Sequence, residues 1–440
     1  MQQENLLILL KMRLTVKSNK KEQIFDLIEE YFSSSDFKSK KNTNKIPLNI
    51  PSYNWEEVTE ALDSLLSTYV TMGKKVKAFE NLFAEYIGVK YAIMVNSGSS
   101  ANLLALSILA NPTTKNFIKK GDEVIVPAVT WSTSIFPIIN VGAIPVFVDV
   151  SSESFTINLE QVEKALTTKT KAIMPVHLLG SACNMKKIMT IAKKHDLFVI
   201  EDACESTGSE FQKKKVGSFG DISTFSFFFS HHISTIEGGM LLTNNREYAD
   251  LAKILRAHGW IRELENKEKI AKSYIGIDKR FLFINIGYNL RPTDIQGAFG
   301  IHQIKKLDKF IEIRRQNAEF FINNLKKYSK YLQMPSEELS TKHVWFGFPL
   351  TVTQNAPFTR EEFVTFLEKK GIETRPIMAG NISEQPVMKL FKHYVFGDIP
   401  NSKIIQKRSF LFGLHQGIGS YERKYIVNTI NEFMTDRMRK

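Results

Sequence analysis

One segment of the chain combines hydroxyl, imidazole and glycine residues at a spacing that suits proton transfer. An apolar run leads to Ser226, the pair His231-His232 begins five residues later, and a Glu-Gly-Gly turn ends at Gly239. Imidazole has an ordinary pKa near ~6.5, so it can take and return a proton at neutral pH. The segment predicts a strand that delivers an acid–base histidine; the alternative is a strand followed by hydrogen-bonded surface histidines.

A second segment has the small residues that an anion site requires. Asn96-Ser97-Gly98-Ser99-Ser100-Ala101-Asn102 follows a predicted strand and opens a predicted helix. Backbone amides at a helix start can approach an anion closely, and the helix dipole favours a phosphate. The segment indicates a phosphate site around Gly98 and Ser99, although any Gly-Ser turn into a helix has a similar pattern.

Acidic residues end a third apolar run. Val199-Ile200-Glu201-Asp202-Ala203-Cys204-Glu205 places Asp202 where a predicted strand finishes. A carboxylate at such a point can pair with a protonated pyridine nitrogen and make the ring an electron sink. A helix N-cap is the alternative interpretation of the same aspartate.

Apolar runs alternate with helical patterns around these segments. Strands are predicted at 91–95, 123–127, 144–150, 172–176, 198–201, 223–229 and 240–243, with helices between them at 101–110, 159–166 and 185–194. This alternation predicts an α/β protein whose mostly parallel sheet is covered on both faces. Such sheets bind ligands beyond the carboxyl ends of their strands, where the three segments lie.

The chain is expected to divide into three parts. Residues 1–45 form a basic N-terminal extension with an amphipathic stretch at 22–32, residues 46–305 form the large domain, and residues 306–440 form a small C-terminal α/β domain. A long helical pattern from Asp294 to about Tyr328 joins the last two parts.

Composition excludes several classes of protein. The 440 residues are 43% hydrophobic, which is enough for a large core. The two cysteines, Cys183 and Cys204, cannot supply the four thiolates of a zinc ribbon or iron–sulfur cluster, and we predict no metal site. The net charge of +13 suits a small anionic substrate, whereas no nucleic-acid motif is present. Neither a membrane span nor a signal peptide is apparent, so we expect a cytoplasmic protein without nucleic-acid or membrane partners.

Taken together, these segments resemble the DegT/DnrJ/EryC1/StrS sugar aminotransferase family. The resemblance covers roughly residues 46–435 and rests also on Gly287-Tyr288-Asn289-Leu290-Arg291 and on Gly371-Ile372-Glu373-Thr374-Arg375-Pro376. It implies the aspartate-aminotransferase fold (PLP fold type I), with pyridoxal 5′-phosphate or pyridoxamine 5′-phosphate as cofactor and a nucleotide-linked keto-sugar as substrate.

The resemblance also implies which residues hold the cofactor. Asp202 would pair with the ring nitrogen, Glu205 would lie near the ring hydroxyl, and Trp131 would stack on the ring. Asn289 would reach the phosphate of the neighbouring subunit, which implies a homodimer. The full cofactor set comprises Gly98, Ser99, Trp131, Asp202, Glu205, Ser226 and Asn289. A core position is the alternative for Trp131.

A second set of positions matches substrate contacts in the family. His258 and Arg291 would hold the amino donor L-glutamate, whose carboxylate suits a guanidinium fork. Arg262 would meet the substrate diphosphate, with a solvated surface arginine as the alternative. The loop Thr71-Met72-Gly73 matches a substrate-contacting loop.

The chain departs from most of the family at the lysine that forms the Schiff base. His231 occupies that position, and residues 216–252 contain no lysine. The resemblance is therefore to the family's 3-dehydratase branch, with His231 as the catalytic base. It implies removal of the C3 hydroxyl from a nucleotide-linked 4-keto-6-deoxyhexose, with GDP-4-keto-6-deoxymannose as the implied substrate. The product would be a 4-keto-3,6-dideoxy sugar for the O-antigen of lipopolysaccharide, for a capsule or for a secondary metabolite. The residues themselves do not distinguish GDP from CDP, dTDP or UDP.

Other interpretations stay open from the sequence. The chain could be a C4 aminotransferase that uses another base, or a non-catalytic binding protein on this fold. A CDP-4-keto-6-deoxyglucose 3-dehydrase of the iron–sulfur type is disfavoured by the two cysteines. His232 is expected to be structural or to orient His231, and His177 either lines the pocket or is a hydrogen-bonded core residue.

Overall fold

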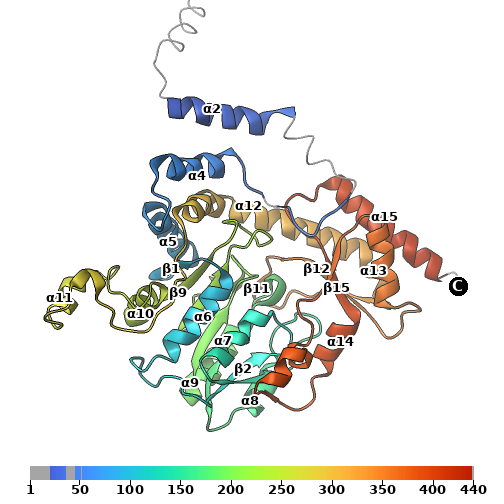
Figure 1. The fold of residues 1–440 in the computed structure, drawn as a ribbon. Helices are drawn as coiled ribbons and strands as arrows, with labels where there is room; N and C mark the ends of the chain where they lie inside the picture. Colours follow the sequence, from blue (N-terminus) through green and yellow to red (C-terminus); the bar gives the residue numbers. More distant parts are fainter. Residues whose placement is uncertain (1–19, 36–44, 51, 439–440) are drawn as a thin grey trace, which may run out of the picture.

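An eight-stranded sheet forms the centre of the computed structural model, which describes residues 20–35, 45–50 and 52–438 (Figure 1). Its strand order is β1-β9-β8-β5-β4-β2-β3-β14. All strands run in one direction except β9, which is antiparallel to β1 and β8, so the mostly parallel sheet is confirmed. The strands are β1 (Tyr91–Val95), β2 (Glu123–Pro127), β3 (Ile144–Val148), β4 (Thr170–Ile173), β5 (Phe198–Asp202), β8 (Ile222–Ser226), β9 (Gly239–Thr243) and β14 (Tyr394–Val395).

Alternate side chains of each strand enter two different cores. In β1, Ala92 and Met94 pack with one set of helices, whereas Ile93 and Val95 pack with the other. This period of two explains why the strands are apolar throughout, since helices cover both faces. One face carries α5 (Lys74–Ile87), α9 (Met185–His195) and α12 (Asp294–Leu325), and the other carries α6 (Gly98–Leu109), α7 (Phe136–Asn140) and α10 (Arg246–Arg256).

Helix α12 connects the large sheet to a second, antiparallel one. Leu307 near its middle lies in the large core, whereas Phe321 lies in the small core. The predicted domain boundary between 305 and 306 falls inside this continuous 32-residue helix, so the division into domains stays a prediction. The small sheet has the order β10 (Leu332–Gln333), β12 (Phe348–Val352), β15 (Ser409–Phe412) and β13 (Thr374–Pro376), and it packs with α13 (Arg360–Lys369), α14 (Pro400–Arg408) and α15 (Ser420–Met438).

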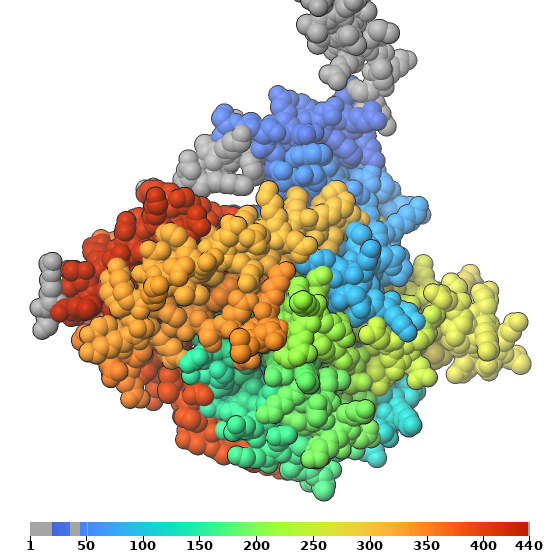
Figure 2. All heavy atoms as spheres, turned by 180° about the vertical axis from the view of Figure 1, so that it is seen from behind, coloured from blue at the N-terminus to red at the C-terminus, as the bar shows by residue number. Residues whose placement is uncertain are grey.

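Two segments stand out from the main body. Helix α2 (Lys20–Ser33) lies over α4 (Trp55–Ser67) and is tied to it by an ion pair between Lys21 and Asp63 (Figure 1). Helix α2 confirms the helix predicted at 22–32. Residues 1–19 and 36–44 of the predicted extension lie outside the described residues. Figure 2 shows the yellow region around α11 (Lys267–Ala271) as a protruding lobe. No helix within the described ranges has the length and apolar character to cross a membrane.

The strand predicted at 223–229 was wrong at its end, since β8 stops at Ser226. The amide of Phe227 donates to the Gly238 carbonyl, and the amide of Thr235 donates to the Phe227 carbonyl. These two bonds close a loop over residues 228–235 and lead the chain back as β9. His231 therefore lies in a loop fixed at both ends, just past the carboxyl end of β8.

Candidate active site

A cavity of about 760 Å³ lies beyond the carboxyl ends of β1, β2, β5 and β8. Its other wall comes from segments beside the strands of the small sheet, where Phe346, Glu373 and Arg375 line it. The cavity thus lies between the two sheets, as expected for an α/β protein of this kind. Seven of the predicted residues line it together: Gly98, Ser99, Trp131, Asp202, Glu205, Ser226 and His231.

His231 lines the cavity as a half-buried side chain with one ring nitrogen already bonded. Its Nδ1 lies 2.6 Å from the Cys204 carbonyl oxygen. A carbonyl can only accept, so Nδ1 carries the proton and Nε2 keeps a free lone pair in the neutral ring. Burial lowers the pKa of His231 to about 4, against the opposing effects of the Cys204 bond and the Asp202 charge. The imidazole is therefore an unprotonated base at neutral pH.

Asp202 forms the floor of the cavity and is held by three donors. Its Oδ2 accepts from the Ser134 hydroxyl at 2.7 Å and from the Asn102 amide at 3.0 Å, and its Oδ1 accepts from the Cys204 amide at 3.1 Å. Asn102 is fixed in turn by the Thr224 hydroxyl. The carboxylate orientation is thus set by neighbouring elements, which is the arrangement needed to present one charge to a ring nitrogen.

Glu205 lies beside this floor with a carboxyl that stays protonated at neutral pH. Burial raises its pKa to about 8; the Leu179 amide, which donates to Oε2 at 2.9 Å, opposes this, and the charge of Asp202 adds to it. A protonated carboxyl can donate a hydrogen bond to an anionic oxygen, such as the hydroxyl oxygen of a pyridine ring.

The start of α6 can approach β8 closely, in what we call the phosphate corner, only because residue 98 is glycine. A Cβ at Gly98 would come within 2.5 Å of the Ser226 Cβ and 3.2 Å of the Cys204 Sγ. Gly98 and Ser99 open α6, where first-turn amides lack intrahelical acceptors, and Ser97 caps the helix by accepting from the Ser100 amide at 3.1 Å.

These residues fit a flat phosphorylated pyridine cofactor. Asp202, which would pair with the ring nitrogen, lines the same cavity as the neutral carboxyl of Glu205 and the phosphate corner. Trp131 also lines it and is 54% exposed, so it is not a core residue. Within the described ranges no cluster of three or more potential metal ligands occurs.

The remaining predicted residues form a second group outside this cavity. The Asn289 side chain accepts from Arg291 Nε at 2.9 Å, and Arg291 Nη2 lies 3.3 Å from His258 Nε2. The loop Thr71-Met72-Gly73 lies against the start of α12, where the Asp294 carboxylate accepts from the Gly73 amide at 3.0 Å. None of these six residues lines the cavity of its own chain.

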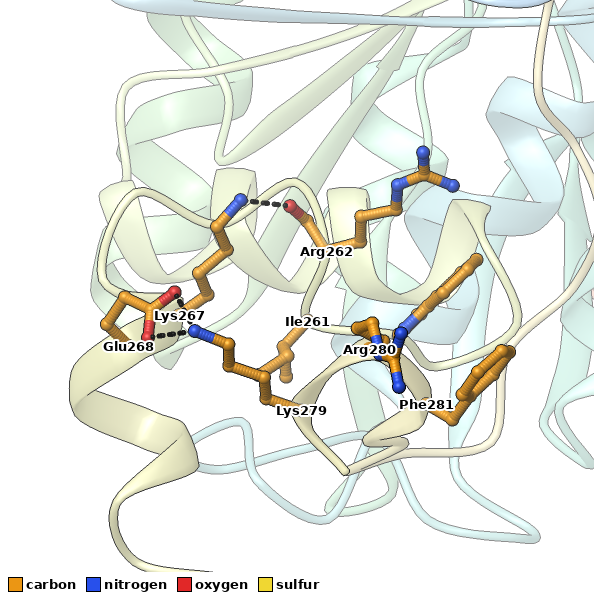
Figure 3. A pocket seen from close by; sticks show the side chains of 8 residues that line it. Ile261, Arg262, Lys267, Glu268, Lys279, Arg280 and Phe281 are labelled. Carbon is orange, nitrogen blue, oxygen red and sulfur yellow. Dashed lines mark hydrogen bonds and ion pairs between the residues drawn. The ribbon is translucent and has the colours of Figure 1, made fainter. Parts of the chain in front are cut away.

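Arg262 lies in a different hollow, on the protruding lobe. A cavity of about 440 Å³ there is lined by Trp260, Arg262, Phe281 and charged neighbours (Figure 3). The Arg262 guanidinium lies over the Trp260 ring at 5.2 Å. Lys279 pairs with Glu268 at 3.0 Å on the opposite side of this hollow (Figure 3). The assignment of Arg262 to the substrate diphosphate stays a prediction.

Two other histidines are core residues. His177 is buried, with Nε2 at 3.1 Å from the Glu201 carboxylate and Nδ1 accepting from the Cys183 amide. His232 is buried and donates from Nε2 to the Val344 carbonyl at 3.0 Å. The core interpretation of His177 and the structural interpretation of His232 are the ones that these contacts support.

Several cavity residues had not been recognised from the sequence. Ser134 and Asn102 hold Asp202, but nothing local marks a serine and a helical asparagine as its partners. Glu373 and Arg375 occur in the motif at 371–376 without a role, and Leu48 and Asn49 come from the first residues of the predicted large domain. Only the fold brings them to one cavity.

The fold and the cavity define a member of the aspartate-aminotransferase fold class. The chain belongs to the DegT/DnrJ/EryC1/StrS aminotransferase family, whose sequence model matches residues 51–431. The GDP-4-keto-6-deoxy-D-mannose 3-dehydratase of Yersinia pseudotuberculosis is 40% identical over 395 residues, which are 88% of this chain and 100% of the relative.

Solved structures of that enzyme are also similar. The Escherichia coli GDP-4-keto-6-deoxy-D-mannose 3-dehydratase with bound hydrated PLP has a TM-score of 0.83 and 39% identity, covering 87% of this chain and 98% of the other. A GDP-4-keto-6-deoxymannose 3-dehydratase with a trapped PLP–glutamate geminal diamine has a TM-score of 0.82 and 39% identity, covering 87% and 99%.

Proposed function

We propose that the protein is a pyridoxal-phosphate-dependent 3-dehydratase that removes the C3 hydroxyl of GDP-4-keto-6-deoxymannose, with L-glutamate as amino donor. The observation that carries the proposal is His231. It lines the cavity with a free Nε2 at the position where most of the family has lysine, and no lysine is among the described residues that line this cavity. The names of the similar enzymes support the choice of sugar and nucleotide.

The overall reaction balances without a further reductant. Glutamate gives up two electrons and its amino group and becomes 2-oxoglutarate. The sugar loses its C3 hydroxyl and gains hydrogen at C3, and the nitrogen leaves as ammonia. The product is a GDP-linked 4-keto-3,6-dideoxy sugar of the kind used in the O-antigen of lipopolysaccharide. Because glutamate and nucleotide sugars are cytoplasmic metabolites, we place the reaction in the cytoplasm.

The cofactor, when bound, supplies an electron-withdrawing ring that accepts and returns the amino group. Asp202 would hold the ring nitrogen protonated, Glu205 would donate to the ring oxygen, and the amides of Gly98 and Ser99 with the Ser226 hydroxyl would hold the phosphate.

His231 moves the proton that the chemistry needs. Its Nε2 removes a proton and, as imidazolium, returns that proton to the C3 hydroxyl as this group departs. Water makes a better leaving group than hydroxide, so one residue both starts and finishes the elimination. An imidazole cannot form the Schiff base that a lysine forms, so the site favours elimination over completed amino transfer.

The second residue group supports a homodimer with shared sites. His258, Asn289 and Arg291 carry donors for a phosphate and a carboxylate, yet none of them lines the cavity of its own chain. We assign them to the cavity of a second copy, where Asn289 would reach the cofactor phosphate and the other two would bind glutamate.

Substitution of His231 tests the catalytic proposal. His231→Asn should keep cofactor affinity within about threefold, because the phosphate corner and Asp202 are untouched, but it should lower dehydration about 10²–10⁴-fold. His231→Lys should replace deoxygenation by amino transfer at C4. Dehydration by His231→Asn at the wild-type rate would contradict the proposal.

Mixed dimers test the shared site. One subunit carries His231→Asn and the other carries Asn289→Ala, and the two are separated by different affinity tags. In a shared arrangement one cavity has both His231 and Asn289 intact, so the mixed dimer should have about half the wild-type activity. Activity no higher than the mean of the two parent variants would contradict sharing.

A further inference from the structure

A fully buried arginine lies behind the catalytic loop, residues 228–235, and has no carboxylate partner among the residues that the structure describes. Arg314 of α12 has no exposed surface, and its Nη1 donates to three carbonyls: Leu414 at 2.8 Å, Trp345 at 2.9 Å and Phe346 at 3.1 Å. Its Nε and Nη2 have no hydrogen-bond partner within the described ranges. Burying a charge whose donors lack hydrogen-bond partners costs folding free energy, so packing alone does not account for this arginine.

The segment that Arg314 binds packs directly against the catalytic histidine. The Phe346 ring lies 5.2 Å from the His231 ring in an edge-on arrangement. The Val344 carbonyl accepts from His232, the next residue along the loop. Trp345 has a left-handed φ of 55°. A tryptophan adopts that conformation only when its surroundings impose it, and the Arg314 bond to its carbonyl is one such constraint.

The same segment also leads to Glu205. The Phe346 amide donates to the Leu179 carbonyl at 2.9 Å, and the Leu179 amide donates to the Glu205 carboxyl at 2.9 Å. Two cavity groups, His231 and Glu205, therefore rest on one segment whose carbonyls converge on Arg314.

We propose that Arg314 is a positioning residue for the reaction: its guanidinium fixes residues 344–346, and through them the orientation of the His231 imidazole and the Glu205 carboxyl. The proposal rests on the proposed catalytic role of His231. The buried, planar guanidinium holds Nη1 at one fixed point among these carbonyls, whereas a lysine would place a compact ammonium there on a flexible stem of different length.

The same charge also acts on the protonation of His231. Burial is the largest cause of the low pKa of His231, and the Arg314 charge lowers it further, whereas the Cys204 bond and Asp202 raise it. Burial lowers the pKa of Arg314 itself to about 9, so the guanidinium is charged at neutral pH. Other titratable and charged groups surround His231, some on the elements packed against it and some in the cavity lining. They are Asp202, Cys204, Glu205, His232, Glu237, Arg314, His343, Glu373, Arg375 and His415.

Two substitutions separate positioning from charge, and a third is the control. Arg314→Lys keeps the positive charge but not the planar guanidinium, and Arg314→Met removes both. Arg360→Met is the matched control, since Arg360 Nη1 also donates to two carbonyls, those of Gln406 and Ser409, in a residue that does not line the cavity. We expect kcat to fall about tenfold in Arg314→Lys and about a hundredfold in Arg314→Met, with the KM for glutamate within twofold of wild type. Arg360→Met should keep the wild-type kcat.

The protonation of His231 can be measured without turnover. Diethyl pyrocarbonate reacts with unprotonated imidazole, and mass spectrometry of the peptide carrying His231 gives its rate in the cofactor-free protein. From a pKa of about 4, the rate at pH 5 should be about 0.9 of that at pH 7.5 in wild type, Arg314→Lys and Arg360→Met. The ratio should fall below this value in Arg314→Met, because loss of the Arg314 charge raises the pKa of His231.

Each outcome decides the proposal. Wild-type kcat in a folded Arg314→Met overturns it, and so does an equal loss of kcat in Arg360→Met. A loss of kcat with an unchanged modification ratio in Arg314→Met overturns the electrostatic part. If Arg314→Met does not fold, Arg314→Lys decides, because wild-type kcat there contradicts positioning. If no variant, wild type included, dehydrates the sugar, the proposed function fails, and the modification ratio still tests the effect of Arg314 on His231.

Discussion

Glu205 should make the unfolding free energy of the cofactor-free protein fall as pH rises. Its pKa is about 8 in the folded chain against an ordinary value of 4.5, so between these values the folded chain holds a proton that the unfolded chain has released. Stability decreases with pH wherever the folded state binds more protons. Each unit is worth about 1.4 kcal/mol, and the carboxyl is buried, so the loss amounts to about 3–4 kcal/mol between about pH 5 and pH 8.

Glu205→Gln removes this titration while keeping an oxygen that can accept from the Leu179 amide. Urea unfolding of wild type and variant should be compared at each pH at one protein concentration. Relative to wild type, the variant should gain about 4 kcal/mol between pH 5 and pH 8.5. The exposed Glu153 provides the control variant Glu153→Gln, which should follow wild type. An identical pH trend in wild type and Glu205→Gln would refute the assignment of a buried, protonated carboxyl.

Three further substitutions test other parts of the site and the fold. Gly98→Ala should weaken cofactor binding at least about tenfold, because its Cβ would come within 2.5 Å of Ser226; a spectroscopic titration with unchanged affinity would contradict this. Asp202→Asn should slow formation of 2-oxoglutarate from glutamate about a hundredfold, and an unchanged rate in a single-turnover assay would remove Asp202 from its role. Arg256→Met should lower the unfolding free energy by about 3–5 kcal/mol, because buried Glu80 loses its buried partner and is left with the exposed Lys77, at 3.5 Å, as its cation; a change below 1 kcal/mol in urea unfolding would argue against the buried pair.

Residues at strand ends could be predicted from the sequence because their surroundings are local. Asp202 and Ser226 end their strands and Gly98 lies three residues after one, and a parallel sheet brings such positions to one edge. His231 could be placed as well, because it lies five residues from a strand end in a loop closed by Gly238. The orientation of its ring could not, since the Cys204 carbonyl comes from the turn after another strand, β5.

Residues that act through the fold left no local signal. Ser134 reaches Asp202 from the turn after β2, and Arg314 reaches residues 345 and 346, beside the catalytic loop, from a long helix. Neither the residue type nor the spacing of Ser134 or Arg314 differs from its neighbours, so the sequence alone does not mark their contacts. The end of β8 was misplaced for a related reason, because three phenylalanines continue its apolar pattern while hydrogen bonds to Gly238 and Thr235 already turn the chain.

Mass spectrometry of the sugar tests the central claim most directly. The protein is incubated with pyridoxal phosphate, glutamate and GDP-4-keto-6-deoxymannose, and the same mixture with His231→Asn serves as the control. The account predicts a sugar that has lost one oxygen atom in the wild-type reaction, one 2-oxoglutarate for each sugar converted, and an unchanged sugar with the variant. Replacement of the keto oxygen by nitrogen would show an aminotransferase and contradict the dehydratase.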